Sequence, residues 1–116
     1  MNHAHTGRKF GRRRGQRRAF VKSLAGNLVM HGRIVTTEAR AKAIRPVVEH
    51  LITEAKKQNL AAFRRLLSKT DKTVAAKLYY DLAARYKNRR GGYLRISHTD
   101  IARRRDGSFR AVIEFV

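Results

Sequence analysis

The stretch that decides the fold is Ile44-Arg45-Pro46-Val47-Val48-Glu49-His50-Leu51-Ile52-Thr53-Glu54-Ala55. It carries an apolar stripe with the three-and-four spacing of a helix that buries one face, formed by Ile44, Val47, Val48, Leu51, Ile52 and Ala55. We expect this to be the central helix of the core. Thr36 or Thr37 would cap its start, with Glu38 in the first turn, where the helix dipole favours an anion. Pro46 predicts either a kink or a break with a new start, because proline lacks the N–H of one helical hydrogen bond.

Other helices are expected on both sides of this segment. The first begins near Gln16 and stops at His31-Gly32, because apolar residues recur every four positions between them. A short helix follows Asn59 as its cap and carries the apolar residues Leu60, Phe63, Leu66 and Leu67. A further helix is expected after a turn at residues 68–71, and residues 88–92 end it. Its apolar residues recur every four positions, at Val74, Leu78, Leu82 and Tyr86.

Strands are expected where apolar residues begin to recur at every second position. Residues 34–37 are β-branched throughout, and alternation resumes at residues 94–97 and 109–116. Asp106-Gly107 favours a hairpin turn between the last two segments, because both residue types tolerate positive φ. The sequence therefore predicts an α/β fold of the α+β type. It has two layers, a small three-stranded mixed or antiparallel sheet packed on three to four helices, and a basic N-terminal extension.

Length and composition set further bounds. The 116 residues suit one domain, and we expect a basic flexible extension over residues 1–15 and one globular domain over residues 16–116. The absence of cysteine excludes disulfides and thiolate metal sites. No apolar run approaches the roughly 18 residues of a membrane span, and no secretory signal is visible. The Arg-rich start also resembles a mitochondrial transit peptide, although its glycines and dense charge disfavour an amphipathic helix. A cytoplasmic protein is the default expectation.

The N-terminal charge pattern gives the strongest indication of a partner. Eight cations lie between Arg8 and Lys22, and the first 33 residues contain no Asp or Glu. Such a segment has no local carboxylates to pair with and little to bury, so we expect it to order only against a polyanion. Over the whole chain the formal charge is +20, and arginine outnumbers lysine by 19 to 9. Because the guanidinium group grips phosphate with two hydrogen bonds and stacks on bases, this excess favours a nucleic-acid partner.

Three basic clusters are the candidate RNA-binding sites: the N-terminal run, the loop around Gly91-Gly92, and the tip of the predicted hairpin. The cations would contact phosphates, and the two aromatic residues Phe10 and Tyr93 would stack on bases or contact the sugar–phosphate chain. The competing interpretations are a solvated tail, a helix stop before a strand, and charges that protect a sheet edge. The predicted residues are Arg8, Lys9, Phe10, Arg12, Arg13, Arg14, Arg17, Arg18, Arg89, Arg90, Tyr93, Arg95, Arg103, Arg104 and Arg105.

No catalytic constellation is visible in the sequence. The eight carboxylates are scattered, and the motifs of P-loops, nucleophile elbows and zinc proteases are absent. His3 and His5 could hold a metal only weakly, because no third ligand lies nearby. We therefore expect a protein without enzymatic activity, cofactor, metal or small-molecule substrate, and without a membrane partner.

Short pieces along nearly the whole chain also occur together in a known family. They are Gly7-Arg8-Lys9, Leu24-Ala25-Gly26-Asn27-Leu28, His31-Gly32-Arg33-Ile34, Thr36-Thr37, Ala41-Lys42-Ala43, Val48-Glu49-His50-Leu51-Ile52-Thr53, Ala76-Lys77-Leu78, Gly91-Gly92-Tyr93 with Arg95-Ile96, and Ile113-Glu114-Phe115-Val116. In this order they resemble the bacterial large-subunit ribosomal protein family numbered seventeen. The start at residues 1–5 and the hairpin at residues 105–108 depart from the family's usual pattern.

This resemblance implies a structural, non-catalytic constituent of the large ribosomal subunit that supports translation. It also implies binding to large-subunit ribosomal RNA near the nascent-chain exit, beside neighbouring ribosomal proteins, so that residues 16–116 would be an RNA-binding domain. Two other interpretations of the charge remain open. One is a DNA-architectural protein, although no clear recognition helix is apparent. The other is a basic protein that acts on membranes or nascent chains, although there is no tryptophan and the cations are spread over several elements.

Overall fold

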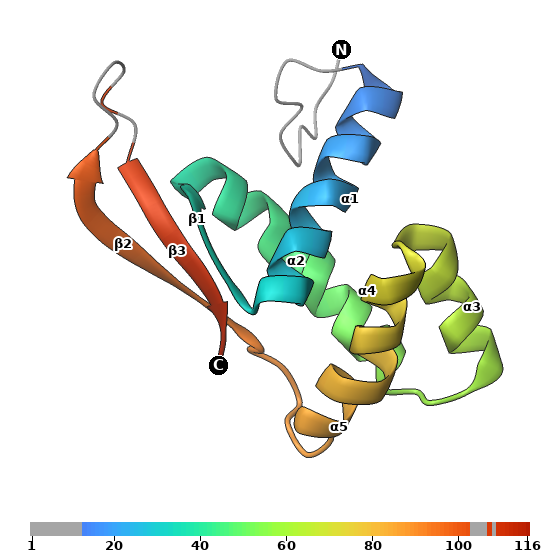
Figure 1. The fold of residues 1–116 in the computed structure, drawn as a ribbon. Coiled ribbons are helices and arrows are strands. Elements are labelled where there is room, and N and C mark those ends of the chain that lie inside the picture. The colour runs from blue at the N-terminus through green and yellow to red at the C-terminus, as the bar shows by residue number, and fades with distance from the viewer. Residues whose placement is uncertain (1–12, 103–106, 108) are drawn as a thin grey trace, which may run out of the picture.

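The computed structural model describes residues 13–102, 107 and 109–116, and of residues 100–102 only the backbone. Four helical segments lie beside one sheet, so the predicted α+β class is confirmed for this part of the chain (Figure 1). The fourth segment is continuous but contains a π turn, labelled η1, between α4 and α5. The elements are α1 (Arg14–His31), β1 (Arg33–Thr37), α2 (Glu38–Ala55), α3 (Leu60–Lys69), α4 (Lys72–Lys77), η1 (Leu78–Leu82), α5 (Ala83–Arg85), β2 (Leu94–Ala102) and β3 (Phe109–Phe115).

The sheet is antiparallel throughout, with the strand order β1-β3-β2. Ile113 of β3 lies opposite Ile34 of β1 and Ile96 of β2, so an aliphatic row crosses all three strands. The register between β2 and β3 is irregular between His98 and Ala102. The last strand in the sequence is therefore the middle strand of the sheet.

Helix α2 is the central element, as its apolar stripe predicts. It contacts all three strands as well as α1, α3 and the π turn. Ile44, Val48 and Ile52 are fully buried along one face. The helix is continuous through Pro46, so the predicted alternative of a break with a new start is wrong. Burial on both sides of the proline holds the two halves in one helix, which offsets the single hydrogen bond that proline removes.

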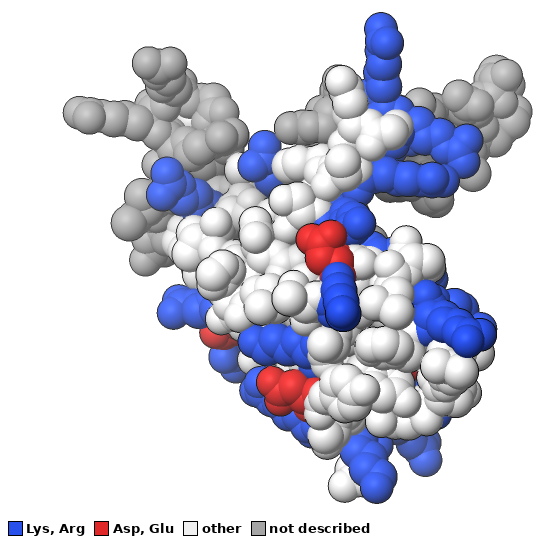
Figure 2. Space-filling view, turned by 45° about the vertical axis from the view of Figure 1, so that its right-hand side comes forward, with Lys and Arg blue, Asp and Glu red and all other residues white. Residues whose placement is uncertain are grey.

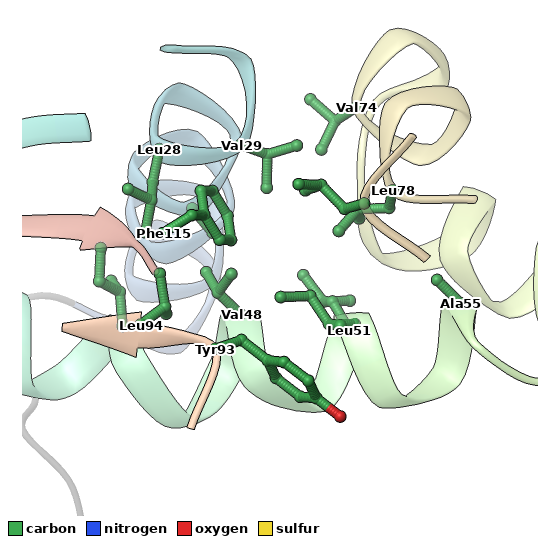
Figure 3. Close-up of a cluster of buried hydrophobic side chains, with 14 of the residues drawn as sticks. Leu28, Val29, Val48, Leu51, Ala55, Val74, Leu78, Tyr93, Leu94 and Phe115 are labelled. Atoms are coloured by element: carbon green, nitrogen blue, oxygen red, sulfur yellow. The ribbon is translucent and has the colours of Figure 1, made fainter. Parts of the chain in front are cut away.

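Side chains from every layer meet in one core (Figure 3). Leu28 and Val29 point into it from α1, Leu51 from α2, and Leu94 and Phe115 from the two hairpin strands. Thr70, which is 4% exposed, donates its hydroxyl proton to the carbonyl of Leu66 at 2.7 Å. Among the described residues, no buried side-chain polar atom lacks a hydrogen-bond partner.

The π turn has a cause that is visible in the sequence. Apolar residues that recur every four positions drift by about 40° per step around a helix of 3.6 residues per turn. A π turn has more residues per turn and corrects part of this drift. At η1 the N–H of Ala83 donates to the carbonyl of Leu78, five residues earlier. All four residues of the predicted repeat are consequently buried, namely Val74, Leu78, Leu82 and Tyr86.

Helix α1 begins at Arg14, two residues before its predicted start, and ends at the predicted glycine. Gly32 has φ of 78°, a left-handed conformation that glycine adopts without a steric penalty, and its N–H donates to the carbonyl of Leu28 at 2.7 Å. This cap turns the chain directly into β1. None of the described helices is both long and apolar enough to cross a lipid bilayer.

Candidate nucleic-acid interface

Helix α1 presents the densest described group of cations. Arg13 precedes the helix, and Arg14, Arg17 and Arg18 occupy its first turns. Arg13, Arg14 and Arg18 are exposed and Arg17 is half-buried. Figure 2 shows lysine and arginine side chains crowding the upper end of the molecule, where α1 begins. The first turn of α1 contains no carboxylate that could neutralise them. We refer to Arg13, Arg14, Arg17 and Arg18 as the α1 cluster.

A groove of about 1090 Å³ lies beside the α1 cluster, between α1, α2 and the end of α3. Three elements contribute cations to its lining. These are Arg14, Arg17, Arg18 and Lys22 of α1, Lys42 of α2 and Lys69 of α3. Among the residues that the structure describes, no Asp or Glu lines the groove. Lys22 and Lys42 each reach one carboxylate, Asp71 at 3.5 Å and Glu38 at 2.7 Å. The sequence does not predict that Lys22, Lys42 and Lys69 share a groove with these arginines, because residues this far apart form no local pattern.

The predicted loop cluster follows α5. Arg89 and Arg90 are exposed there, and Gly92 has φ of 63°. The Arg89 guanidinium donates to the carbonyl of Gly91 at 3.1 Å, and the Arg89 carbonyl accepts from Lys56 and from the hydroxyl of Tyr93. These bonds fix the backbone of the loop and leave both guanidinium groups at the surface.

Tyr93 requires a correction. It is 2% exposed and packs against the ring of Tyr86, with the ring centroids 5.1 Å apart. Its hydroxyl accepts from the Lys56 ammonium at 2.8 Å, and that ammonium also lies 5.1 Å from the ring centroid. Figure 3 shows the ring lying over α2. The prediction that Tyr93 stacks on a base is therefore wrong, because its face is covered by the core.

Arg95 lies in the sheet, where its side chain is paired. Its guanidinium donates to Glu114 Oε1 at 2.7 Å, and Arg33 approaches Glu114 Oε2 at 3.7 Å from the other neighbouring strand. The Arg95 side chain is still 62% exposed. It can contact a phosphate only while sharing its charge with this carboxylate, which makes it a weaker candidate than the α1 cluster.

Several predicted positions lie outside the described residues. They are Arg8, Lys9, Phe10 and Arg12 of the N-terminal run, the hairpin-tip residues Arg103, Arg104 and Arg105, and the histidine pair His3 and His5. The structure describes the α1 cluster and the loop with Arg89 and Arg90, and the fold keeps these two groups apart. They lie at opposite ends of the molecule, above and below the core in Figure 1. Within the described ranges, no three His, Asp or Glu side chains are grouped as metal ligands.

Two carboxylates in ion pairs should make stability depend on pH. The hydrogen bond from Arg95 holds the pKa of Glu114 below its ordinary value, and the hydrogen bond from Arg65 does the same for the pKa of Glu54. A lowered folded-state pKa stabilises the fold above the ordinary value of 4.5, and this contribution is lost as the pH falls through the lowered pKa. The double variant Glu54→Gln, Glu114→Gln should therefore unfold at lower denaturant concentration than the wild type at pH 7.

The difference between the denaturation midpoints of the two proteins should shrink as the pH is lowered from 7 to 3, because the carboxylates become increasingly protonated below pH 4.5. Asp81→Asn is the matched control, since Asp81 is exposed and forms no ion pair with another described residue. A difference between wild type and double variant that is as large at pH 3 as at pH 7 would contradict this assignment.

The fold and the charge together define a small, strongly basic α+β protein with its cations gathered on a helix end, a groove and a loop. The family model for ribosomal protein L17 matches residues 20–116. The chain is also 42% identical over 117 residues to the large ribosomal subunit protein bL17 of Agrobacterium fabrum (strain C58 / ATCC 33970), covering 100% of this chain and 82% of that protein. The chain belongs to the ribosomal protein L17 family. All four residues of the α1 cluster precede the matched range, which begins at Phe20.

Proposed function

We propose that this protein is a structural, non-catalytic constituent of the large ribosomal subunit, and that it binds ribosomal RNA near the nascent-chain exit beside neighbouring ribosomal proteins. Membership of the ribosomal protein L17 family supports the assignment to the subunit. The single observation that carries the RNA-binding role is the α1 cluster. It joins four arginines over six residues, with no carboxylate in the first turn of the helix.

The geometry favours RNA held through its phosphates. Arg14, Arg17 and Arg18 stand at positions i, i+3 and i+4 of α1 and therefore share one face of the helix, which suits an RNA backbone that runs along this face. Arg89 and Arg90 offer a second contact at the opposite end of the molecule. Two separated contacts suit a folded RNA whose strands pass on both sides of the protein. RNA shape and unpaired bases would then provide specificity, since proteins read the deep groove of an RNA duplex poorly.

Sedimentation of a cell extract tests the assignment. In a sucrose gradient the protein should migrate with the large subunit, and treatment with RNase should release it to the top of the gradient. Cross-linking within the intact subunit should join it to nascent chains that have just left the exit. Migration unchanged by RNase, or displacement of ribosomal RNA by duplex DNA at equal salt, would contradict the proposal and favour the DNA-binding alternative.

A further inference from the structure

We infer that the groove between α1 and α2 binds one unpaired nucleotide of RNA, with the base against an apolar floor and the adjoining phosphates on the cationic rim. This inference rests on the proposed RNA-binding function and adds to it the kind of RNA feature that is recognised. Contacts with phosphates alone would not need an apolar floor. The apolar floor is therefore the feature that points to a bound base.

The floor of the groove is apolar. Val21 and Ala25 form it on the side of α1, and Ala43, Val47 and Leu51 form it on the side of α2. Ala25 and Leu51 belong to the buried core, whereas Val21, Ala43 and Val47 are half-buried and reachable from outside. Covering an apolar surface that is wet in the free protein with a flat aromatic base removes it from water, which lowers the free energy of the complex.

The rim of the groove carries positive charge that the described carboxylates do not cancel. Lys22 and Lys42 each have one acidic neighbour and remain 46% and 57% exposed. Arg14, Arg18 and Lys69 form no ion pair within the described part of the chain. Cations on α1 and on the facing elements therefore flank the floor on both sides. A nucleotide whose base lies on the floor would place its phosphates beside them.

Other occupants satisfy only part of this arrangement. A paired duplex would lie across the rim and leave the floor wet, because its bases are stacked inside. The sequence of residues 1–12 carries the same sign of charge as the rim, with Arg8, Lys9 and Arg12 and no carboxylate, so opposite charge does not argue for this segment as the occupant. An acidic peptide would pair with the rim, but it covers the floor only where an aromatic side chain stands between its carboxylates. An unpaired nucleotide always carries both parts, a planar base and adjoining phosphates, and guanidinium planes are suitable stacking partners for it.

Binding to two matched RNAs tests this inference. The full chain is titrated with a synthetic RNA hairpin that carries a single bulged uridine, and with the same hairpin fully paired. We expect the bulged hairpin to bind about tenfold more tightly, the order of effect that stacking of one base provides. Equal affinities together with a steep salt dependence would overturn the inference and leave the proposed RNA binding intact. Weak binding of both RNAs that does not respond to salt would contradict the proposed function itself.

Filling the groove provides a matched pair of variants. Ala43→Phe places a ring over the floor without changing charge, and Ala61→Phe makes the same change at an exposed position of α3 outside the groove. The preference for the bulged hairpin over the fully paired hairpin should fall from about tenfold to about one in Ala43→Phe and stay near tenfold in Ala61→Phe. A retained preference in a folded Ala43→Phe protein would overturn the inference.

A photochemical measurement on the wild type makes the test independent of whether Ala43→Phe folds. A 4-thiouridine at the bulge should cross-link to residues 21–25 or 43–51, as mapped by mass spectrometry of the digested complex. Cross-links confined to other segments would overturn the inference. So would displacement of the bulged hairpin by polyglutamate at matched charge concentration, because it would show that the site selects anions without regard to a base.

Discussion

Replacing the whole α1 cluster by glutamine should weaken RNA binding about a hundredfold at 0.15 M salt, because four phosphate contacts and the counterions they release are lost together. If the wild type neutralises roughly ten phosphates, its log–log salt slope should lie near −7 to −9, and the variant's slope should be shallower by about 3. Glutamine is nearly as good a helix former as arginine, so α1 should persist. The measurement is a titration of ribosomal RNA at several salt concentrations.

The control is a second quadruple variant with the same change of charge outside both the α1 cluster and the groove. Four exposed cations of the α2–α3 turn, α3 and α4 are replaced by glutamine, which lowers the formal charge by the same four units: Lys57, Arg64, Arg65 and Lys72. Its affinity should fall far less, because general attraction between unlike charges is screened within about 8 Å at this salt. Equal losses in the two variants would mean that net charge rather than a localised contact drives binding.

Replacing Tyr93 by alanine should destabilise the fold by about 3–5 kcal/mol, because it removes an aromatic side chain from a packed core. The thermal midpoint should fall by about 10–20 °C. Tyr93→Phe keeps the ring and loses only the hydroxyl contacts with Lys56 and the carbonyl of Arg89, so it should cost about 1 kcal/mol. Calorimetry or chemical denaturation of the two variants measures both effects.

Tyr80 provides the comparison for Tyr93. It lies in the π turn, is 69% exposed, and touches the rings of Phe63 and Tyr79. Tyr80→Ala should cost less than about 1 kcal/mol, as is usual for exposed positions. If Tyr93→Ala left the melting temperature unchanged but abolished RNA binding, the stacking role would be restored and its burial in the core would be refuted.

The sequence predicts helix α2 and the strands well, because their burial patterns are local and periodic. It fails at Tyr93 for a physical reason. Alternation would place Tyr93 on the same face as Arg95, but β2 begins only at Leu94, and the positive φ of Gly92 turns the chain just before it. Tyr93 therefore does not follow the strand pattern and its ring enters the core.

The candidate site shows the same distinction between local and distant information. The α1 cluster is contiguous in the sequence and is predicted directly. The groove is assembled from residues between Arg14 and Thr70 in separate helices, so only the packing of α1 against α2 reveals it. The pairing of Arg95 and Arg33 with Glu114 likewise depends on the register of three strands.

The strand order has a consequence for synthesis of the chain. Strand β1 pairs with β3, and all the described helices except α1 are made between them. Neither β1 nor β2 therefore acquires its neighbour in the sheet until residues 109–115 have been translated. The helices can form early from local contacts, whereas the sheet forms last and requires contacts between distant parts of the polypeptide. During that interval strand edges are open to wrong partners, and mutual repulsion among positively charged copies is a physical safeguard against aggregation.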